Sequence, residues 1–324
     1  MTTLFVASNG GHLAQLHRLS RRMGVPAEDA LWVTFDGAQA RSLLAGAKTL
    51  FVPDIAERDV AGVLRAMGPA RRLLRRPSQI RAVVSTGSAI ALAFLPLAAA
   101  AGIAAHYIES AARVRVPSLT GRLLQAMPGV TLYRQYPWAG RGRWRYGGSV
   151  FDGFQVRQRD RREVRRIVVT IGSDRPFTRL LAAAAAILPP SATVLWQTGE
   201  SGLDGLDIQA RPFVPSPELD QAIREADVVI AHAGCGSALT ALAAGKCPIL
   251  VPRDPSRGEV VDDHQIEIAR WLASRGLAIF RPAEALSPAD LEIAAARSVF
   301  QPDDPPPFNL AKPAWARPAW ARPA

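Results

Sequence analysis

The sequence predicts an α/β protein made of two doubly wound domains, each with a parallel sheet. Short β-branched runs alternate with Ala-, Leu- and Arg-rich stretches of helical length, a pattern typical of parallel sheets. The alternation stops at the charged run of residues 157–166 and then starts again. The chain has 324 residues, of which 48% are apolar. This length exceeds one domain and suits two cores of about 150 residues each.

Strands and domain limits follow from this alternation. In the first half, β-branched and aromatic runs predict strands at residues 3–8, 31–35, 49–53, 82–86, 104–110 and 130–134. In the second half, similar runs predict strands at residues 167–173, 192–198, 227–234, 247–252 and 277–280. We therefore expect a first domain at residues 1–156, a charged linker at 157–166 and a second domain at 167–300. Residues 301–324 are expected to form a disordered tail, because the repeated unit PAWAR is too rich in proline for a helix or a central strand.

One uncharged run raises the question of a membrane span. Residues 88–105 carry no charge and reach the lower length limit for such a span. Pro96 and Gly102 interrupt the run, so we expect a buried crossover helix followed by a strand. The first residues lack the basic leader of a signal peptide, and Cys235 and Cys247 lack the spacing of a disulfide framework or a zinc site. Both observations favour the cytoplasm, a reducing compartment.

Glycine-rich or polar turns follow several of the predicted strands. Their sequences are SNGGHL at residues 8–13, STGS at 85–88, IESAAR at 108–113, IGSDRPF at 171–177 and HAGCGS at 232–237. Ligands of doubly wound sheets bind outside the carboxyl ends of the strands. These turns are therefore expected to line a cleft between the two domains.

Three of these turns have the chemistry of a phosphate site. Gly10 and Gly11 let the backbone approach a ligand, and the helix that follows directs free N–H groups and its positive dipole end towards an anion. The same holds for residues 172–173 and 234–237, although a glycine after a strand can also be only a tight connection. GCGSAL lacks the third glycine of G-x-G-x-x-G, and no G-x-x-x-x-G-K-[ST] occurs. A dehydrogenase or an ATPase is therefore disfavoured.

At these motifs the sequence resembles known glycosyltransferases. The second half, from IGSDRPFTRLL through HAGCGSALTALAAGKCPILVPR to EVVDDHQIEIA, is similar to the donor-binding half of GT-B enzymes related to the peptidoglycan lipid-linked N-acetylglucosaminyltransferase. The first half contains SNGGHLAQL, STGSAIALAFLPLAA, YIESAARVRVPSLTGRLL and YRQYPW. It resembles the membrane-associating subunit of the two-subunit enzyme that adds the second N-acetylglucosamine to dolichol diphosphate, and also its bacterial exopolysaccharide counterparts. The resemblance spans residues 3–153 and 166–281 and implies a natural fusion of two subunits, with a GT-B fold of two Rossmann-like domains facing a cleft.

The resemblance implies an inverting glycosyltransferase. It would move a sugar from a UDP-sugar to a polyprenyl-diphosphate-linked saccharide in cell-surface or exopolysaccharide biosynthesis, with no cofactor and no metal. A nucleotide-sugar 2-epimerase of the same fold and a non-catalytic scaffold that recruits another transferase are the alternatives. A nucleic-acid partner is not expected, because nothing resembles a known RNA-binding module and aromatic residues make up only 7% of the chain.

In the second domain, the resemblance places the sugar donor against the glycine turns and the run EVVDDHQ. The expected donor-binding residues are Gly172, Ser173, His232, Ala233, Gly234, Gly236, Ser237, Glu259, Asp263, His264 and Gln265. His232 could instead be a satisfied strand-end histidine, and Asp262 or Asp263 could be a helix N-cap. The related enzymes have a ribose-binding Glu eight residues after the histidine, where this chain has Thr240. Either Glu259 or the Thr240 hydroxyl would then bind the ribose.

In the first domain, sugar transfer needs a base that takes the proton of the acceptor. His12 is the first candidate, because an imidazole titrates near neutral pH, and Glu109 is the rival candidate. Alternatively, Glu109 pairs with Arg113, His12 only binds the acceptor phosphate, or the base lies in EVVDDHQ. The expected acceptor-binding residues are Asn9, Gly10, Gly11, Ser85, Thr86, Gly87 and Arg113.

The net charge of +11 indicates an anionic partner. Arginines stand beside Leu and Trp at residues 71–81 and 141–146, a composition typical of a surface that rests on anionic lipid head groups. The first run could equally be a solvated helix face. We expect the protein to be peripheral on the cytoplasmic face of the cell membrane, held by charge or by apolar insertion at residues 94–97.

Overall fold

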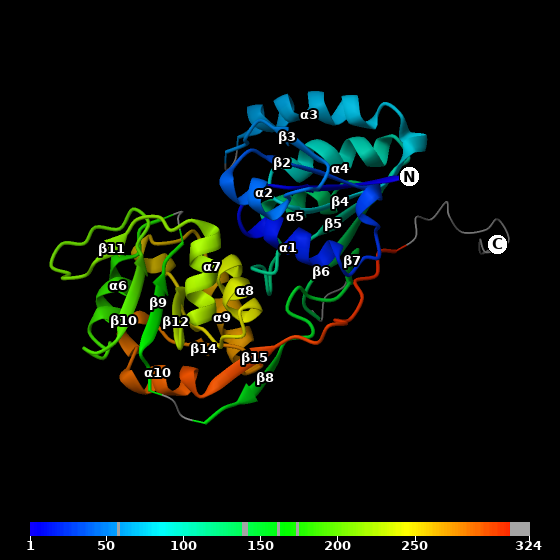
Figure 1. Ribbon diagram of the computed structural model, residues 1–324. Coiled ribbons are helices and arrows are strands. Elements are labelled where there is room, and N and C mark those ends of the chain that lie inside the picture. The colour runs from blue at the N-terminus through cyan, green and yellow to red at the C-terminus, as the bar shows by residue number, and fades with distance from the viewer. Residues whose placement is uncertain (57–58, 138–141, 161–162, 173–174, 312–324) are drawn as a thin grey trace. The chain divides into compact units, whose positions relative to one another are not determined.

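The computed structural model describes residues 1–56, 59–137, 142–160, 163–172 and 175–311. The chain divides into two compact units (Figure 1). The first unit contains Met1–Asp152 and the chain from Pro306 onward, and the second contains Gly153–Pro305. Ser173 and the PAWAR repeats, which were singled out in the sequence, lie outside the described residues.

The first unit is a doubly wound α/β sheet. Its strands are β1 (Thr2–Ala7), β2 (Ala30–Phe35), β3 (Thr49–Val52), β4 (Ile80–Gly87), β5 (Ala104–Ile108), β6 (Val130–Arg134) and β7 (Trp144–Tyr146). Its helices are α1 (Gly11–Ser20), α2 (Ala38–Leu43), α3 (Val60–Leu74), α4 (Ile90–Ala100) and α5 (Leu119–Gln125). All neighbouring strands run parallel, in the order β3-β2-β1-β4-β5-β6-β7.

Helices cover both faces of this sheet, because successive side chains of a strand point to opposite sides. Leu4 and Val6 of β1 join a buried cluster with residues of α3 and α4. Phe5 points the other way, where its ring stacks on Trp32 with the centroids 4.8 Å apart. His17 of α1 also contacts Trp32. Figure 1 shows the same layering, with α3 and α4 on one face and α1 on the other.

The uncharged run at residues 88–105 forms α4 followed by β5, as the sequence predicted. Phe94 and Leu95 are fully buried beneath α3 and against the sheet. The expected apolar insertion at residues 94–97 is therefore wrong for these two side chains. Among the described residues, no helix has both the length and the apolar character of a membrane span.

The second unit repeats the architecture of the first. Its sheet contains β9 (Arg166–Thr170), β10 (Thr193–Gln197), β11 (Ala210–Arg211), β12 (Val228–His232), β13 (Ile249–Val251) and β14 (Ile279–Phe280). Its helices are α6 (Thr178–Ala185), α7 (Ser216–Glu225), α8 (Cys235–Ala243), α9 (His264–Ser274) and α10 (Pro288–Ala295). The strands are parallel, in the order β11-β10-β9-β12-β13-β14. Two parallel, doubly wound sheets are thus confirmed, and a strand is present at each predicted position.

The region of the predicted linker contains a strand. Residues 155–158 form β8 (Gln155–Gln158), which pairs antiparallel with β15 (Arg297–Phe300). Every residue of β8 is exposed. The charge of this region keeps it out of a core, as expected, but does not prevent pairing through the backbone.

Residues 306–311 differ from the expected disordered tail, because they pack on the first unit. Arg22 Nε donates a hydrogen bond to the carbonyl oxygen of Pro306 at 2.6 Å. Phe308 is buried, with its ring 5.8 Å from that of Tyr133. The Ala311 N–H donates to the Tyr133 hydroxyl oxygen at 2.7 Å. The chain therefore returns from the second unit and is anchored on the first by backbone and aromatic contacts.

Candidate functional site

Each sheet reverses its strand order once, between β1 and β4 in the first unit and between β9 and β12 in the second. The connections after two such strands leave in opposite directions, which opens a ligand crevice at the carboxyl ends of the strands. In the first unit, His12 and Gly87 lie at this edge. In the second unit, Gly172 and His232 lie there. The turns that the sequence singled out therefore occupy the ligand-binding edge of each sheet.

The imidazole of His12 is fixed by the turn after β4. Its Nδ1 lies 2.7 Å from the carbonyl oxygen of Thr86, and the Thr86 hydroxyl donates to the carbonyl oxygen of His12 at 2.8 Å. A carbonyl oxygen only accepts, so Nδ1 carries the proton and Nε2 of the neutral ring keeps a lone pair. Gly87 has a φ of 104°, and a Cβ there would lie 3.0 Å from the ring. A glycine is therefore required beside His12.

The electrostatics keep His12 neutral. Burial is the largest cause and lowers the pKa of His12, while the hydrogen bond to Thr86 opposes it. The charge of Arg113, an expected acceptor-binding residue, lowers the pKa of His12 further. A neutral imidazole with a free Nε2 has the protonation state of a general base.

The turn at Asn9 and Gly10 is braced by side chains from β2 and α2. Thr34 donates to the Asn9 side-chain oxygen at 3.1 Å, and the Gly10 N–H donates to Gln39 Oε1 at 2.6 Å. The Gly10 amide, expected to face a phosphate, is thus engaged within the protein. Gly11 and His12 open α1, and first-turn amides have no partner within their own helix.

Ser85 and Thr86 hold the second turn of the first unit. Both side chains are fully buried. Ser85 Oγ accepts a hydrogen bond from the Gly87 N–H at 3.1 Å, and Thr86 bonds to His12 as described above. The structure therefore places these two expected acceptor-binding residues behind the turn, where they shape it.

Glu109, the rival candidate for the base, is a buried carboxylate held by four donors. Oε1 accepts from the Tyr107 hydroxyl at 3.1 Å and from the Ser110 N–H at 3.0 Å. Oε2 accepts from the N–H and the hydroxyl of Ser118, at 3.0 and 3.1 Å. Burial is the largest influence and raises the pKa of Glu109, although these hydrogen bonds oppose it. Glu109 is therefore a carboxylate that holds a loop in place through hydrogen bonds.

In the second unit, His232 lies between two glycines. A Cβ on Gly172, whose φ is 76°, would lie 2.8 Å from the His232 ring, and a Cβ on Gly234 would overlap His232 Nε2. His232 Nδ1 is 3.4 Å from Ser237 Oγ. Burial first, and the charge of Arg253 second, lower the pKa of His232 to about 3. The ring is therefore neutral at physiological pH and fills the space that the two glycines leave open.

Helix α8 begins directly after this histidine. The Gly234 N–H donates to the His232 carbonyl oxygen at 2.8 Å, and the buried Ala233 donates to the Val251 carbonyl oxygen at 3.1 Å. Both amides are thus engaged. The N–H groups of Cys235, Gly236 and Ser237 form the first turn, where the helix dipole favours an anion.

The run after β13 is held by ion pairs. Arg179 Nε and Nη2 donate to the two carboxylate oxygens of Glu259 at 3.0 and 2.8 Å, and Arg179 Nη1 donates to Glu284 at 2.8 Å. The Asp254 N–H donates to Glu259 Oε2 at 2.8 Å. Glu259, expected at the donor sugar or the ribose, is therefore already a paired carboxylate.

The start of α9 shows what Asp262 and Asp263, the two possible N-cap residues, do. Asp263 holds the N-cap position but makes no side-chain cap hydrogen bond. Asp262 Oδ1 accepts from the His264 N–H at 3.2 Å and lies 2.5 Å from His264 Nδ1. Gln265 is buried, and its Oε1 accepts from the Arg253 N–H at 3.0 Å. This end of α9 therefore fixes the loop after β13.

Several residues that shape these edges were not predicted from the sequence. Arg253 is buried, and its Nη2 donates to the carbonyl oxygens of Ile171 at 3.0 Å and Arg175 at 2.6 Å, which ties the loops after β9 and β13 together. Gln39, described above, was also missed. Phe213 follows β11 and exposes 57% of its surface, an aromatic face at the carboxyl edge of the sheet. A single Arg or Phe in a loop, or a single Gln in a short helix, is not part of a hydrophobic pattern and could not be predicted.

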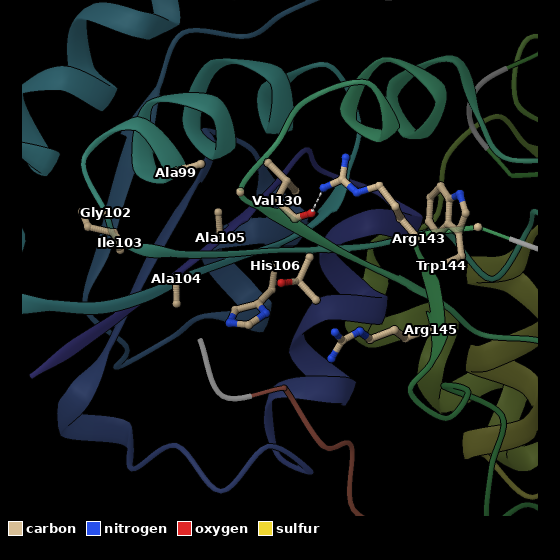
Figure 2. Close-up of a pocket in the computed structure, with 13 residues that line it drawn as sticks. Ala99, Gly102, Ile103, Ala104, Ala105, His106, Val130, Arg143, Trp144 and Arg145 are labelled. Atoms are coloured by element: carbon tan, nitrogen blue, oxygen red, sulfur yellow. Dashed lines mark hydrogen bonds between the residues drawn. The ribbon is translucent and has the colours of Figure 1, made fainter. Parts of the chain in front are cut away.

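A separate pocket of about 530 Å³ lies at the other edge of the first sheet, at the amino ends of β5 and β6. Figure 2 shows His106, Arg143, Trp144 and Arg145 among its lining residues. It contains none of the expected site residues. Among the residues that the structure describes, no group of three His, Cys, Asp or Glu side chains could hold a metal ion.

Comparison with known proteins shows a family match over most of the second unit. Residues 166–310 match the glycosyltransferase family 28 C-terminal domain. The chain is 38% identical over 90 residues to the UDP-N-acetylglucosamine--N-acetylmuramyl-(pentapeptide) pyrophosphoryl-undecaprenol N-acetylglucosamine transferase of Ralstonia nicotianae, covering 28% of this chain and 23% of the relative. It is 32% identical over 128 residues to the protein of the same name from Verminephrobacter eiseniae, covering 36% and 34%. The chain thus matches less than half the length of either relative.

The fold as a whole is also found in solved structures. MurG of Acinetobacter baumannii aligns with a TM-score of 0.56 at 19% identity, over 90% of this chain and 89% of that one. The glycosyltransferase SnogD of Streptomyces nogalater aligns with a TM-score of 0.55 at 18% identity, over 91% of each chain. Residues 166–310 are therefore similar to the glycosyltransferase family 28 C-terminal domain, in a chain whose two Rossmann-like sheets have the fold of GT-B glycosyltransferases.

Proposed function

We propose that the protein is an inverting glycosyltransferase that moves a sugar from a UDP-sugar to a polyprenyl-diphosphate-linked saccharide, in cell-surface or exopolysaccharide biosynthesis. The observation that carries the proposal is a neutral histidine at the ligand-binding edge of each sheet, beside glycines that cannot be replaced without displacing its ring. The first unit then supplies the acceptor side, as a fused counterpart of a separate subunit. The second unit supplies the donor side.

The donor side has features that suit a nucleoside diphosphate. Gly172 and Gly234 leave room for the ring of His232, and the first-turn amides of α8, which suit a phosphate, lie at the same edge. The family 28 match covers this part of the chain, and the relatives are named as UDP-N-acetylglucosamine-dependent transferases. Gln265 and Arg253 would hold the loop after β13 in place, while His264 and Asp263 would face the sugar.

The acceptor side has features that suit proton transfer. In an inverting reaction, the acceptor hydroxyl attacks the anomeric carbon, the bond to UDP breaks on the opposite face, and a base takes the hydroxyl proton. Nε2 of His12 has the lone pair for that step, because Nδ1 is committed to the Thr86 carbonyl oxygen. Arg113 provides a cation near His12 for the diphosphate of the acceptor.

A membrane surface would present the lipid-linked acceptor. Val116, Leu119 and Leu123 expose 60%, 51% and 43% of their surfaces, and Arg115 and Arg122 beside them are exposed. Apolar side chains flanked by arginines suit the boundary between anionic head groups and acyl chains. We therefore propose a peripheral position on the cytoplasmic face of the membrane, with α5 and its preceding loop turned towards the lipid.

The proposal is tested with the purified full-length chain. We expect UDP-sugars to raise the melting temperature more than GDP- or dTDP-sugars, and one of them to support transfer to a polyprenyl-diphosphate-linked monosaccharide in mixed micelles. NMR of the product should show that the transferred sugar has the opposite anomeric configuration to the donor. Retention of configuration would contradict an inverting reaction. Conversion of the UDP-sugar without any acceptor would indicate a 2-epimerase, and no nucleotide binding at all would indicate a scaffold.

A further inference from the structure

A buried carboxylate closes the loop between β5 and α5. The four donors to Glu109 come from both ends of this loop, Ser110 at its start and Ser118 at its end, and from Tyr107 beneath it. Ser118 is also the N-cap of α5, where its hydroxyl accepts from the Gly121 N–H at 3.0 Å. One side chain therefore fixes where the loop leaves the sheet and where α5 begins.

The same loop is bound to α1 by the buried amide side chain of Gln15. Gln15 Oε1 accepts from the Ala111 N–H at 2.7 Å and from Gln135 Nε2 at 3.1 Å. Gln15 Nε2 donates to Ser110 Oγ at 3.2 Å. Gln135 Nε2 also donates to the Glu109 carbonyl oxygen at 3.0 Å. Gln15 thus joins α1, the loop and the end of β6 through direct hydrogen bonds.

The register between α1 and this loop sets the distance between two functional groups. Gln15 and His12 are three residues apart on α1 and therefore share a helix face. Arg113 sits in the loop, where its N–H donates to the Ser110 carbonyl oxygen at 2.9 Å. The charge of Arg113 acts on His12 and is one of the causes that lower its pKa. A loop that moved relative to α1 would carry this cation away from the imidazole.

We propose that Gln15 is a positioning residue, whose carboxamide holds Arg113 beside His12 so that Arg113 receives the diphosphate of the acceptor next to the base. The ligand part of this inference rests on the proposed function, whereas the positioning part rests on the hydrogen bonds of Gln15 and on the effect of the Arg113 charge on His12. Gln15 itself touches no reacting atom. It acts through Ser110 and Ala111, and Glu109 keeps the same loop closed from the other side.

The first test measures position without any activity. The groups that set the pKa of His12 are its burial, the Thr86 carbonyl and Arg113, so loss of the Arg113 charge from its neighbourhood should raise that pKa. In NMR titrations of labelled histidines, with the His12 signal assigned from a His12→Asn variant, Gln15→Met should raise the pKa of His12. Arg113→Met should raise it too, and the double variant should raise it no further than Arg113→Met alone.

Two further variants serve as a control and as a substitute for Gln15→Met. Ser20→Ala removes a buried hydrogen bond to His17 on the same helix, without contact to the loop, and should leave the pKa of His12 unchanged. If Gln15→Met does not fold, Ser110→Ala removes only the hydroxyl that accepts from Gln15 and Ala112, and should shift the pKa of His12 upward by a smaller amount. An unchanged pKa of His12 in the loop variants, or in Arg113→Met, would overturn the proposal.

The second test uses the transfer reaction. Gln15→Met should raise the KM for the lipid-linked acceptor about tenfold, with kcat and the donor KM nearly unchanged, as expected when binding rather than chemistry is lost. A lower kcat at an unchanged acceptor KM would refute the assignment, because Gln15 would then act on the chemical step. If the unmodified protein transfers no sugar, the proposed function fails, and the titrations still decide whether Gln15 positions Arg113.

Discussion

At the scale of single residues, Gly234 carries the tightest steric constraint on the donor side. A Cβ there would overlap the His232 ring, although its φ of −80° suits any residue. Gly234→Ala should therefore displace the ring without straining the backbone. We expect UDP binding, measured by calorimetry, to weaken at least about tenfold, or about 1.4 kcal/mol.

Gly202→Ala is the matched control for this variant. A Cβ on Gly202 meets no atom within 4 Å, so UDP affinity should stay at the wild-type value. If both alanine variants bind UDP equally well, the glycine turn before α8 is only a tight connection. The donor-site assignment to His232 and its neighbours would then fail.

The proposed proton-transfer role of His12 can be tested by mutation. His12→Ala should reduce turnover by about 10²-fold or more, with donor affinity retained, as expected for the loss of a general base. Because burial and Arg113 lower the pKa of His12, the base stays neutral below the ordinary histidine value of 6.5. The acid limb of the profile of kcat/KM against pH should therefore lie below pH 6.5 in the unmodified protein.

Glu109→Ala separates the two candidates for the base. Since Glu109 closes the loop that carries Arg113, its loss should mainly raise the acceptor KM. If Glu109→Ala loses more turnover than His12→Ala, and His12→Ala changes only the acceptor KM, the two roles are reversed. Near-normal turnover in both variants would move the base to residues 259–265.

The site residues that could be predicted from the sequence are those that lie close, along the chain, to a predicted strand. His12, Gly87, Gly172 and His232 each lie at or just after the carboxyl end of a predicted strand, so the fold rule alone brings them to the ligand-binding edge. Gln15 escaped notice, because its partner Ala111 lies 96 residues away along the chain. The carboxylate of Glu109 shows the same limit, since its environment is made by tertiary contacts and not by its neighbours in sequence.

At the scale of elements, hydrophobic periodicity predicted the buried strands and failed for the exposed ones. The strands β4 and β12 are almost wholly buried and stand out as β-branched runs. All of β8 is exposed, and β7 has three residues, none of them buried. Such strands form because their backbone pairs with a neighbouring strand, and that neighbour cannot be predicted from the sequence. This is why the predicted linker was assigned no structure.

The returning segment at residues 306–311 gives a test at this scale. Phe308 is buried against Tyr133, so Phe308→Ala should destabilise the first unit by about 3–5 kcal/mol, the usual cost of such a truncation in a core. Chemical denaturation followed by intrinsic fluorescence would measure it. Ending the chain after Pro305 should cost at least as much, whereas ending it after Ala311 should leave the stability unchanged. Equal stability of both shortened chains would show that the segment is not an anchor.

At the scale of the whole molecule, the chain crosses between its two units twice, at residues 152–153 and 305–306. The change in composition predicted a boundary at residues 156–157. The second crossing was not predicted, because a proline-rich segment that packs as an extended strap has no helical or strand periodicity. Arg22 illustrates the point, since it bonds to the carbonyl oxygen of Pro306, 284 residues away. The net charge, by contrast, follows from the composition of the whole chain and can be counted without knowledge of the fold.

The net charge of +11 leads to the last prediction, that the protein sediments with anionic liposomes at low salt and leaves them as salt rises. Added salt shortens the reach of surface charge from about 10 Å at 0.1 M to about 3 Å at 1 M. Arg71, Arg72 and Arg75 are exposed at the end of α3, so reversing all three to Glu should reduce sedimentation at low salt. Replacing Leu119 and Leu123 by Ser should leave low-salt capture intact and lower the salt concentration needed for release, since the apolar contact is not screened. Equal binding to neutral liposomes would show that charge does not bring the protein to the membrane, and binding of every variant at the wild-type level would exclude both surfaces.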